Sequence, residues 1–223
     1  DLYWFDLIPV ISFLLLRGEC RYCGAPIKPK YLAWEILTGI LFVINFLIFY
    51  QTMANHGYNT SALLIIELLF RFAIIGLLTF ISIYDLDNMI ILDKVLFPSI
   101  GVALAYRLAT DFTNLPNYLL ASLVSACFIG FLILVTKGKG MGMGDVKFVI
   151  LLGLITGWPE SLLGLLIAFI SGALVGVMLV FSRSKNIKEA IPFGPFLSLG
   201  ALVALFWGEQ ILDWYLHSFI ILG

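Results

Sequence analysis

Long apolar runs dominate this sequence and restrict it to folds that form in a membrane. A helix needs about 20 apolar residues to cross a bilayer. Seven runs approach or exceed that length, and they lie at about 34–53, 61–84, 95–110, 117–136, 146–158, 160–181 and 194–216. Backbone amides in hydrocarbon must pair internally, and continuous runs rather than alternating ten-residue segments indicate helices rather than a β-barrel.

Composition supports the same conclusion. The chain is 61% hydrophobic and only 12% charged, whereas an ordinary soluble domain carries roughly a quarter charged residues. This excludes a water-soluble enzyme, and the absence of a short repeat excludes a fibrous chain. We therefore predict an all-α fold, a polytopic transmembrane helix bundle with about seven spans. The short run at 146–158 is expected to be a half-helix or a tilted helix inside the bundle.

Basic residues gather in alternate loops and predict which side each loop faces. The loops 1–33, 85–94, 137–145 and 182–193, with the first residues of the following spans, hold all but two of the 13 Lys and Arg residues. The exceptions are Arg71 and Arg107. The positive-inside rule places these four loops in the cytoplasm. The members of this set are Arg17, Arg21, Lys28, Lys30, Lys94, Lys137, Lys139, Lys147, Arg183, Lys185 and Lys188.

We predict two parts, a cysteine-containing cytoplasmic loop over 1–33 and a transmembrane domain over 34–223. The chain starts at Asp1 without a signal peptide, so we expect that a segment precedes it. We expect the lipid bilayer as a partner, and no nucleic acid.

Two acidic clusters at cytoplasmic span ends are the best candidates for chemistry. Asp85 and Asp145 lie at the edge of apolar runs, where a carboxylate is costly unless it is solvated, paired or used. Two close aspartates can share a proton, so that one activates water while the other donates to a substrate carbonyl. The alternatives are that Asp85 is a solvated span end and that Asp145 is a helix N-cap. His56 and His217 are the only histidines, and neither has the neighbours of a catalytic triad or a zinc protease motif.

Glycines precede Asp145 at every second position from Gly138 to Gly144. Glycine permits close backbone approach, and an extended substrate could pair with such a stretch by strand addition. A flexible connector is the alternative. We take Gly142, Gly144 and Lys147 as candidate substrate-binding residues. The Lys147 ammonium could instead lower the pKa of a neighbouring carboxyl or snorkel to the interface.

Together these residues resemble the prepilin peptidases, or type IV leader peptidases, of the GxGD class of membrane aspartyl proteases. The resemblance rests on four segments in the family's order. They are the cysteine loop from Ile8 to Gly24, Tyr84–Asp87 with the first catalytic aspartate at Asp85, Gly142–Lys147 with the GxGD signature, and Ile191–Leu197.

The resemblance implies a membrane endopeptidase with Asp85 and Asp145 as its catalytic pair. It also implies a further span before Asp1, which would give eight spans in the whole protein. The substrate of the peptidase would be a prepilin or pseudopilin, cut after a glycine between a basic leader and an apolar helix, on the cytoplasmic side of the bacterial inner membrane. Partners would belong to type IV pilus, type II secretion or competence machinery. The peptidase needs no cofactor. Many family members also methylate the new N-terminus with S-adenosylmethionine. Which aspartate is the base stays open, since a coupled pair titrates as a unit.

Cys20 and Cys23 have the spacing of a zinc knuckle. Structural zinc takes four ligands, so we expect a zinc site here only if a further cysteine pair lies upstream. Two other functions stay open at this point. One is a transporter or channel that uses intramembrane acids such as Glu67, and the other is a scaffold that docks through the cysteine loop.

Overall fold

The computed structural model describes residues 3–56, 62–138, 140–182 and 191–219. Lys139, Arg183, Lys185 and Lys188 of the predicted cytoplasmic set lie outside the described residues. The described part is helical apart from loops and one isolated bridge between Glu19 and Pro26. The all-α prediction is therefore confirmed. The chain divides into two compact units, Asp1–Thr79 and Phe80–Gly223, which are described separately below.

The first unit begins with two short helical turns that the sequence had indicated only as a loop, η1 (Trp4–Leu7) and α1 (Ile11–Leu15). They are followed by α2 (Pro29–His56) and by the first part of α3 (Ala62–Asn88). α2 begins five residues before the predicted run, because Pro29 suits a first helical position where no N–H bond is lost. His56 ends α2, and its side chain lies outside the described residues.

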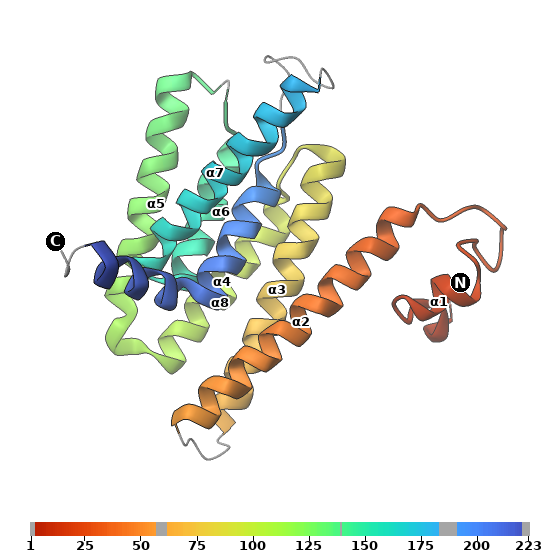
Figure 1. The fold of residues 1–223 in the computed structure, drawn as a ribbon, viewed down its shortest axis with the longest axis horizontal. Coiled ribbons are helices and arrows are strands. Elements are labelled where there is room, and N and C mark those ends of the chain that lie inside the picture. The colour runs from red at the N-terminus through yellow and green to blue at the C-terminus, as the bar shows by residue number, and fades with distance from the viewer. Residues whose placement is uncertain (1–2, 57–61, 139, 183–190, 220–223) are drawn as a thin grey trace. The chain divides into compact units, whose positions relative to one another are not determined.

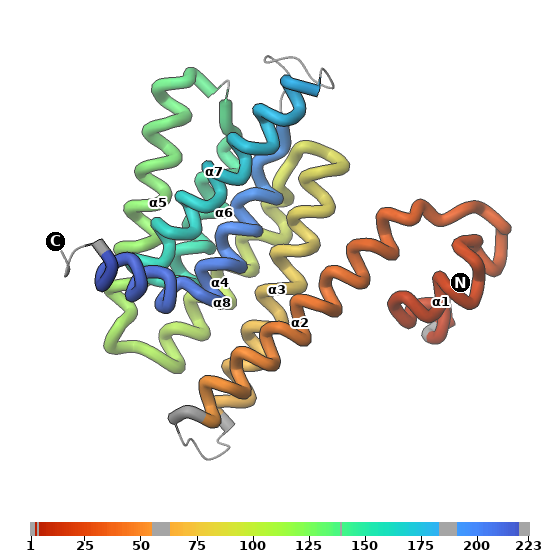
Figure 2. The backbone as a smooth tube through the Cα atoms, viewed as in Figure 1, coloured from red at the N-terminus to blue at the C-terminus, as the bar shows by residue number. Residues whose placement is uncertain are grey.

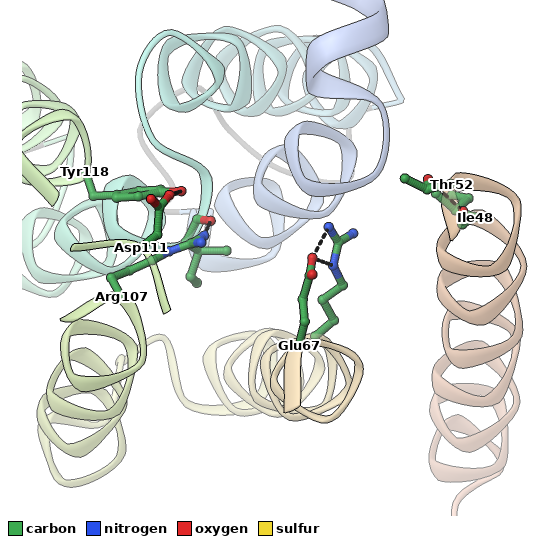
Figure 3. Close-up of polar contacts among 8 residues, drawn as sticks. Ile48, Thr52, Glu67, Arg107, Asp111 and Tyr118 are labelled. Atoms are coloured by element: carbon green, nitrogen blue, oxygen red, sulfur yellow. Dashed lines mark hydrogen bonds and ion pairs between the residues drawn. The ribbon is translucent and has the colours of Figure 1, made fainter. Parts of the chain in front are cut away.

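One charged pair lies inside the apolar part of this unit. In α3 the Arg71 guanidinium donates two hydrogen bonds to Oε1 of Glu67, with Nη2 at 2.8 Å (Figure 3). The two residues are four apart and therefore share a helix face. Mutual neutralisation lowers the cost of placing both charges in an apolar helix.

The second unit contains the rest of α3 and the remaining helices. These are α4 (Asp93–Thr110), η2 (Phe112–Asn114), α5 (Leu115–Thr136), α6 (Met143–Thr156), α7 (Glu160–Phe181) and α8 (Gly194–Phe219). Within this unit α5 packs against α6, and α7 runs beside α8 (Figures 1 and 2).

α6 is the buried centre of the second unit. It has 14 residues, about 21 Å of helix at 1.5 Å per residue, less than the thickness of the bilayer core. Phe148, Val149, Leu151 and Leu152 are fully buried, and α4, α5, α7 and α8 contact this helix. The predicted short helix inside the bundle is confirmed.

Glycines allow the helices of this unit to approach closely. A side chain at Gly200 on α8 would overlap the carbonyl of Gly164 on α7, and one at Gly153 on α6 would overlap the backbone of α5 at Ser122. Small residues at helix contacts are typical of membrane bundles, where close van der Waals packing holds helices together.

Arg107 anchors the end of α6. Its guanidinium donates to the carbonyl oxygens of Leu154, at 3.0 Å, and Ile155, which lack partners inside the helix. The same group lies 4.0 Å from the centre of the Tyr118 ring, and the Tyr118 hydroxyl donates to Asp111 at 3.1 Å (Figure 3). These contacts explain why Arg107 lies at the end of the bundle opposite the predicted cytoplasmic loops, which hold most of the other basic residues.

Five of the described helices are long and apolar enough to cross a membrane, namely Pro29–Ala54, Leu63–Asn88, Phe112–Thr136, Glu160–Phe181 and Gly194–Ser218. All seven predicted runs are helical, but α4 and α6 are not among these five. α6 is too short, and α4 carries Asp93, Lys94 and Arg107 within 18 residues.

Candidate active site

The chemistry-bearing residues of the second unit meet in one pocket of about 440 Å³. It lies among the end of α3, the start of α4, the glycine segment before α6 and the segment before α8. Asp85, Asp145, Gly142, Gly144 and Lys147, the residues indicated by the sequence, all line it. The rest of the lining is Met89, Ile90, Ile91, Asp93, Gly138, Gly140, Met141, Ile191, Pro192 and Phe193.

Asp145 is held by the glycine segment at the start of α6. The N–H of Gly142 donates to its Oδ2 at 2.9 Å, and the N–H of Asp145 donates back to the Gly142 carbonyl at 3.1 Å. This reciprocal pair caps the helix. Gly142 is the N-cap of α6 and Asp145 is its third residue, so the alternative of Asp145 as the N-cap is wrong. Its carboxyl instead accepts from the N–H of the N-cap residue while it lines the pocket.

Burial makes Asp145 an unusually weak acid. The side chain is only 7% exposed, and loss of solvation raises its pKa to about 6. The Gly142 N–H opposes this shift, and the negative charge of Asp85 adds to it. A carboxyl with such a pKa exchanges its proton near neutral pH, which suits acid–base catalysis.

Asp85 is 4% exposed on the last turn of α3. Its Oδ2 accepts a hydrogen bond of 2.8 Å from the N–H of Gly194, the first residue of α8. The alternative of a solvated span end is therefore wrong, because the carboxyl is buried and held by the protein backbone. Gly194 lies in the Ile191–Leu197 segment, but its role could not be predicted from the sequence, because the two partners are 109 positions apart.

Lys147 is paired across the pocket. Its Nζ lies 2.8 and 2.7 Å from the two oxygens of Asp93 and 5.1 Å from the centre of the Phe97 ring. The pair joins α6 to the first residue of α4 and fixes the chain segment that follows Asp85. This pairing could not be predicted from the sequence, because Asp93 and Lys147 are 54 residues apart.

The apolar wall of the pocket is anchored by contacts between aromatic rings, in tilted and edge-to-face arrangements. Phe193 lies 5.2 Å from Phe169 on α7 and 6.2 Å from Phe196 on α8, measured between ring centres. Phe169 in turn contacts Phe128 on α5 at 5.8 Å. The segment before α8 therefore packs directly against α7 and, through Phe169, is connected to α5.

Cys20 and Cys23 lie apart in the sequence from this pocket, in the first unit. Hydrogen bonds from the backbone of Tyr22 and Cys23 lower the pKa of the Cys20 thiol, which favours the thiolate that metals bind. Among the described residues no group of three or more His, Cys, Asp or Glu residues could hold a metal, and the two cysteines would be only half of the four ligands that a structural zinc takes.

Comparison with known proteins identifies the family. The profile of the type IV leader peptidase family matches residues 72–177, which include Asp85 and Asp145. The profile of the bacterial peptidase A24 N-terminal domain matches residues 1–49. The chain belongs to the type IV leader peptidase family. It is thus a multi-pass membrane peptidase, and this membership favours the peptidase over the transporter and the scaffold.

Relatives of this leader peptidase share most of its length. The prepilin leader peptidase/N-methyltransferase of Aeromonas hydrophila is 34% identical over 217 residues, which are 96% of this chain and 70% of the relative. The proteins of the same name from Legionella pneumophila and Pseudomonas aeruginosa are 32% and 31% identical over 94% of this chain and 70% and 69% of theirs. No solved structure matches the chain.

Proposed function

We propose that this leader peptidase cuts prepilins or pseudopilins after a glycine, using Asp85 and Asp145 as a pair that activates water. The observation that carries the proposal is that both buried aspartates line the same open pocket. The names of the relatives support the substrate class, and a pocket at helix ends suits a bond next to an apolar helix.

The pair would act with one shared proton. The ionised carboxylate takes a proton from water as the water oxygen attacks the scissile carbonyl carbon, and the protonated partner donates to the carbonyl oxygen. The tetrahedral diol intermediate then collapses. One of its hydroxyls returns a proton to the ionised carboxylate, the C–N bond breaks, and the departing nitrogen receives a proton from the other carboxyl. The products are a carboxylic acid and an amine, and no metal or covalent intermediate takes part.

Gly142 and Gly144 would leave room for the substrate backbone. A side chain at Gly144 would meet Ile91 at 3.1 Å and narrow the pocket. An extended leader could then pair with backbone groups of this segment. Lys147, held by Asp93 at the pocket wall, would interact with a substrate carbonyl oxygen or the new carboxylate.

The positive-inside arrangement supports a pocket that faces the cytoplasm of a bacterial inner membrane. Type IV pilus, type II secretion or competence systems would supply the substrate. The relatives' names support a second step in which S-adenosylmethionine donates a methyl group to the new N-terminus. The cysteine-bearing unit, where Cys20 and Cys23 would hold a structural zinc with an upstream pair, is the part we assign to that step.

The proposal is tested with purified protein in detergent and a purified prepilin. Asp85→Asn and Asp145→Asn should each abolish the cleaved product seen by mass spectrometry. Asp213→Asn is the matched control, because Asp213 is an exposed acid on α8, and it should cleave normally. Normal cleavage by either the Asp85→Asn or the Asp145→Asn variant would rule out the proposal that these two residues act as a catalytic pair.

A further inference from the structure

The contact between Gly194 and Asp85 is unusually tight. The Gly194 N–H donates to Asp85 Oδ2 at 2.8 Å. A Cβ built on Gly194 would lie only 2.6 Å from the same oxygen, with the other close atoms also in the Asp85 side chain, Cγ at 3.1 Å and Cβ at 3.2 Å. All three nearest atoms belong to Asp85, so this acid is the first group that a side chain at Gly194 would meet.

The backbone does not require glycine at this position. The glycines with positive φ are Gly18, Gly24, Gly138 and Gly157, and Gly194 is not among them. A residue with a side chain could adopt its backbone angles, so the reason for glycine here is steric. A side chain at position 194 would displace the Asp85 carboxyl.

The start of α8 also provides an electrostatic reason for this contact. The first N–H groups of a helix have no partner inside the helix, and they carry the positive end of the helix dipole. Gly194 is the first residue of a 26-residue helix. Its N–H therefore offers an acceptor such as Asp85 Oδ2 a fixed, buried partner.

The turn that carries Gly194 is itself fixed. The neighbouring Phe193 packs on Phe169 and Phe196. A Cβ added to Gly172 of α7 would lie only 3.4 Å from both Phe193 and Phe196. The turn therefore cannot easily move away from α3, and its position determines that of the Asp85 carboxyl.

We infer that Gly194 is a positioning residue for the peptidase reaction. It holds Oδ2 of Asp85 through its N–H and leaves room for the carboxyl by its missing side chain, so that the orientation of this carboxyl in the pocket is fixed. Asp145 is held in the same way, by the N–H of Gly142 on its Oδ2. Each of the two proposed catalytic acids, Asp85 and Asp145, is thus oriented by a glycine amide from a different helix start. The inference rests on the proposed function, because positioning matters only if Asp85 takes part in cleavage.

The first arm of the test measures melting temperature in detergent and needs no activity. Gly194→Ala should lower the melting temperature of the wild-type protein. In an Asp85→Ala background, where Oδ2 and Cγ are gone, the same change should cost less than half as much. Gly130→Ala is the control, since an added Cβ there meets nothing within 4 Å, and its effect should be the same in both backgrounds. Equal losses from Gly194→Ala in both backgrounds would overturn the inference.

The second arm measures cleavage of the purified prepilin. A displacement of about 1 Å in a reacting group can cost on the order of 100-fold in rate. Gly194→Ala should therefore lower kcat about 10- to 100-fold and leave KM within about twofold. An unchanged kcat would overturn the positioning role. If Asp85→Asn instead cleaves normally, the proposed function fails, while the melting-temperature arm still reports on the contact itself.

Discussion

Nζ of Lys147 lies 2.7 Å from Oδ2 of Asp93, and this pair connects α6 to the first residue of α4 beside the pocket. The two side chains are 26% and 53% exposed, so solvent weakens their attraction. The pair's contribution to stability should therefore not exceed about 1 kcal/mol. Its larger effect is geometric, because it fixes the segment between Asp85 and α4.

A double-mutant cycle tests this geometric role. Lys147→Met and Asp93→Asn should each lower kcat/KM several-fold, and the double variant should lose no more than the worse single variant, because both changes break the same contact. Cleavage kinetics with a purified prepilin provide the measurement. Additive losses would instead mean that Lys147 and Asp93 act on the substrate independently.

The raised pKa of Asp145 predicts an alkaline limit to activity. With a pKa of about 6, Asp145 loses the shared proton as the pH rises through that value, and the pocket then holds two ionised carboxylates and no acid for the carbonyl oxygen. We expect kcat to fall about tenfold for each pH unit above the limit, measured from pH 4.5 to 8 in detergent with substrate in excess. A constant kcat between pH 5 and 8 would contradict the assignment.

The same shift predicts how stability depends on pH. Because the folded state raises the pKa of Asp145 above its ordinary value of 3.8, ionisation of this group destabilises the fold. The loss begins above about pH 4 and is complete above about pH 6, and it amounts to at most about 3 kcal/mol. Asp145→Asn removes this loss and still accepts the Gly142 N–H.

Melting temperatures check this prediction. The Asp145→Asn protein should melt above the wild-type protein at pH 7.5 and close to it at pH 4. Asp213→Asn, the exposed control, should follow the wild-type protein at both values. A wild-type melting temperature that exceeds that of Asp145→Asn at pH 7.5 would refute the burial argument.

Close helix contact between α7 and α8 predicts a strong effect of a single methyl group. Gly200→Ala would force the new Cβ against the backbone carbonyl of Gly164, which cannot rotate away as a side chain can. We expect a loss of about 1–3 kcal/mol, measured by thermal unfolding in detergent. Gly130→Ala, with open space around its Cβ, should leave stability unchanged or raise it by up to about 1 kcal/mol, because alanine is more favourable than glycine in a helix interior. A similar effect from both variants would exclude tight packing as the cause.

The sequence allowed the helices and the two pocket aspartates to be predicted, because both leave local signals. A long apolar run predicts a helix without information from the rest of the chain, and Asp85 and Asp145 are recognisable as acids at the edges of such runs. Contacts made by distant residues leave no such signal. The bond from Gly194 to Asp85 and the pair of Lys147 with Asp93 depend on how α3, α4, α6 and α8 converge.

Helix starts were the least accurate part of the prediction. α6 begins at Met143 rather than at 146, because Gly142 and Asp145 cap each other and extend the helix into the glycine segment. The domain boundary at residue 33 stays a prediction. The roles of Gly142, Gly144 and Lys147 in substrate binding likewise remain proposals for kinetic tests.

The most direct test of the catalytic pair is a comparison of Asp85→Asn, Asp145→Asn and the double variant in single-turnover cleavage of a prepilin. Residues that act as one unit lose nearly all activity when either is removed. The account predicts a rate loss of at least about 10³-fold in each single variant, with no further loss in the double variant. Cleavage at the wild-type rate by either single variant would contradict it.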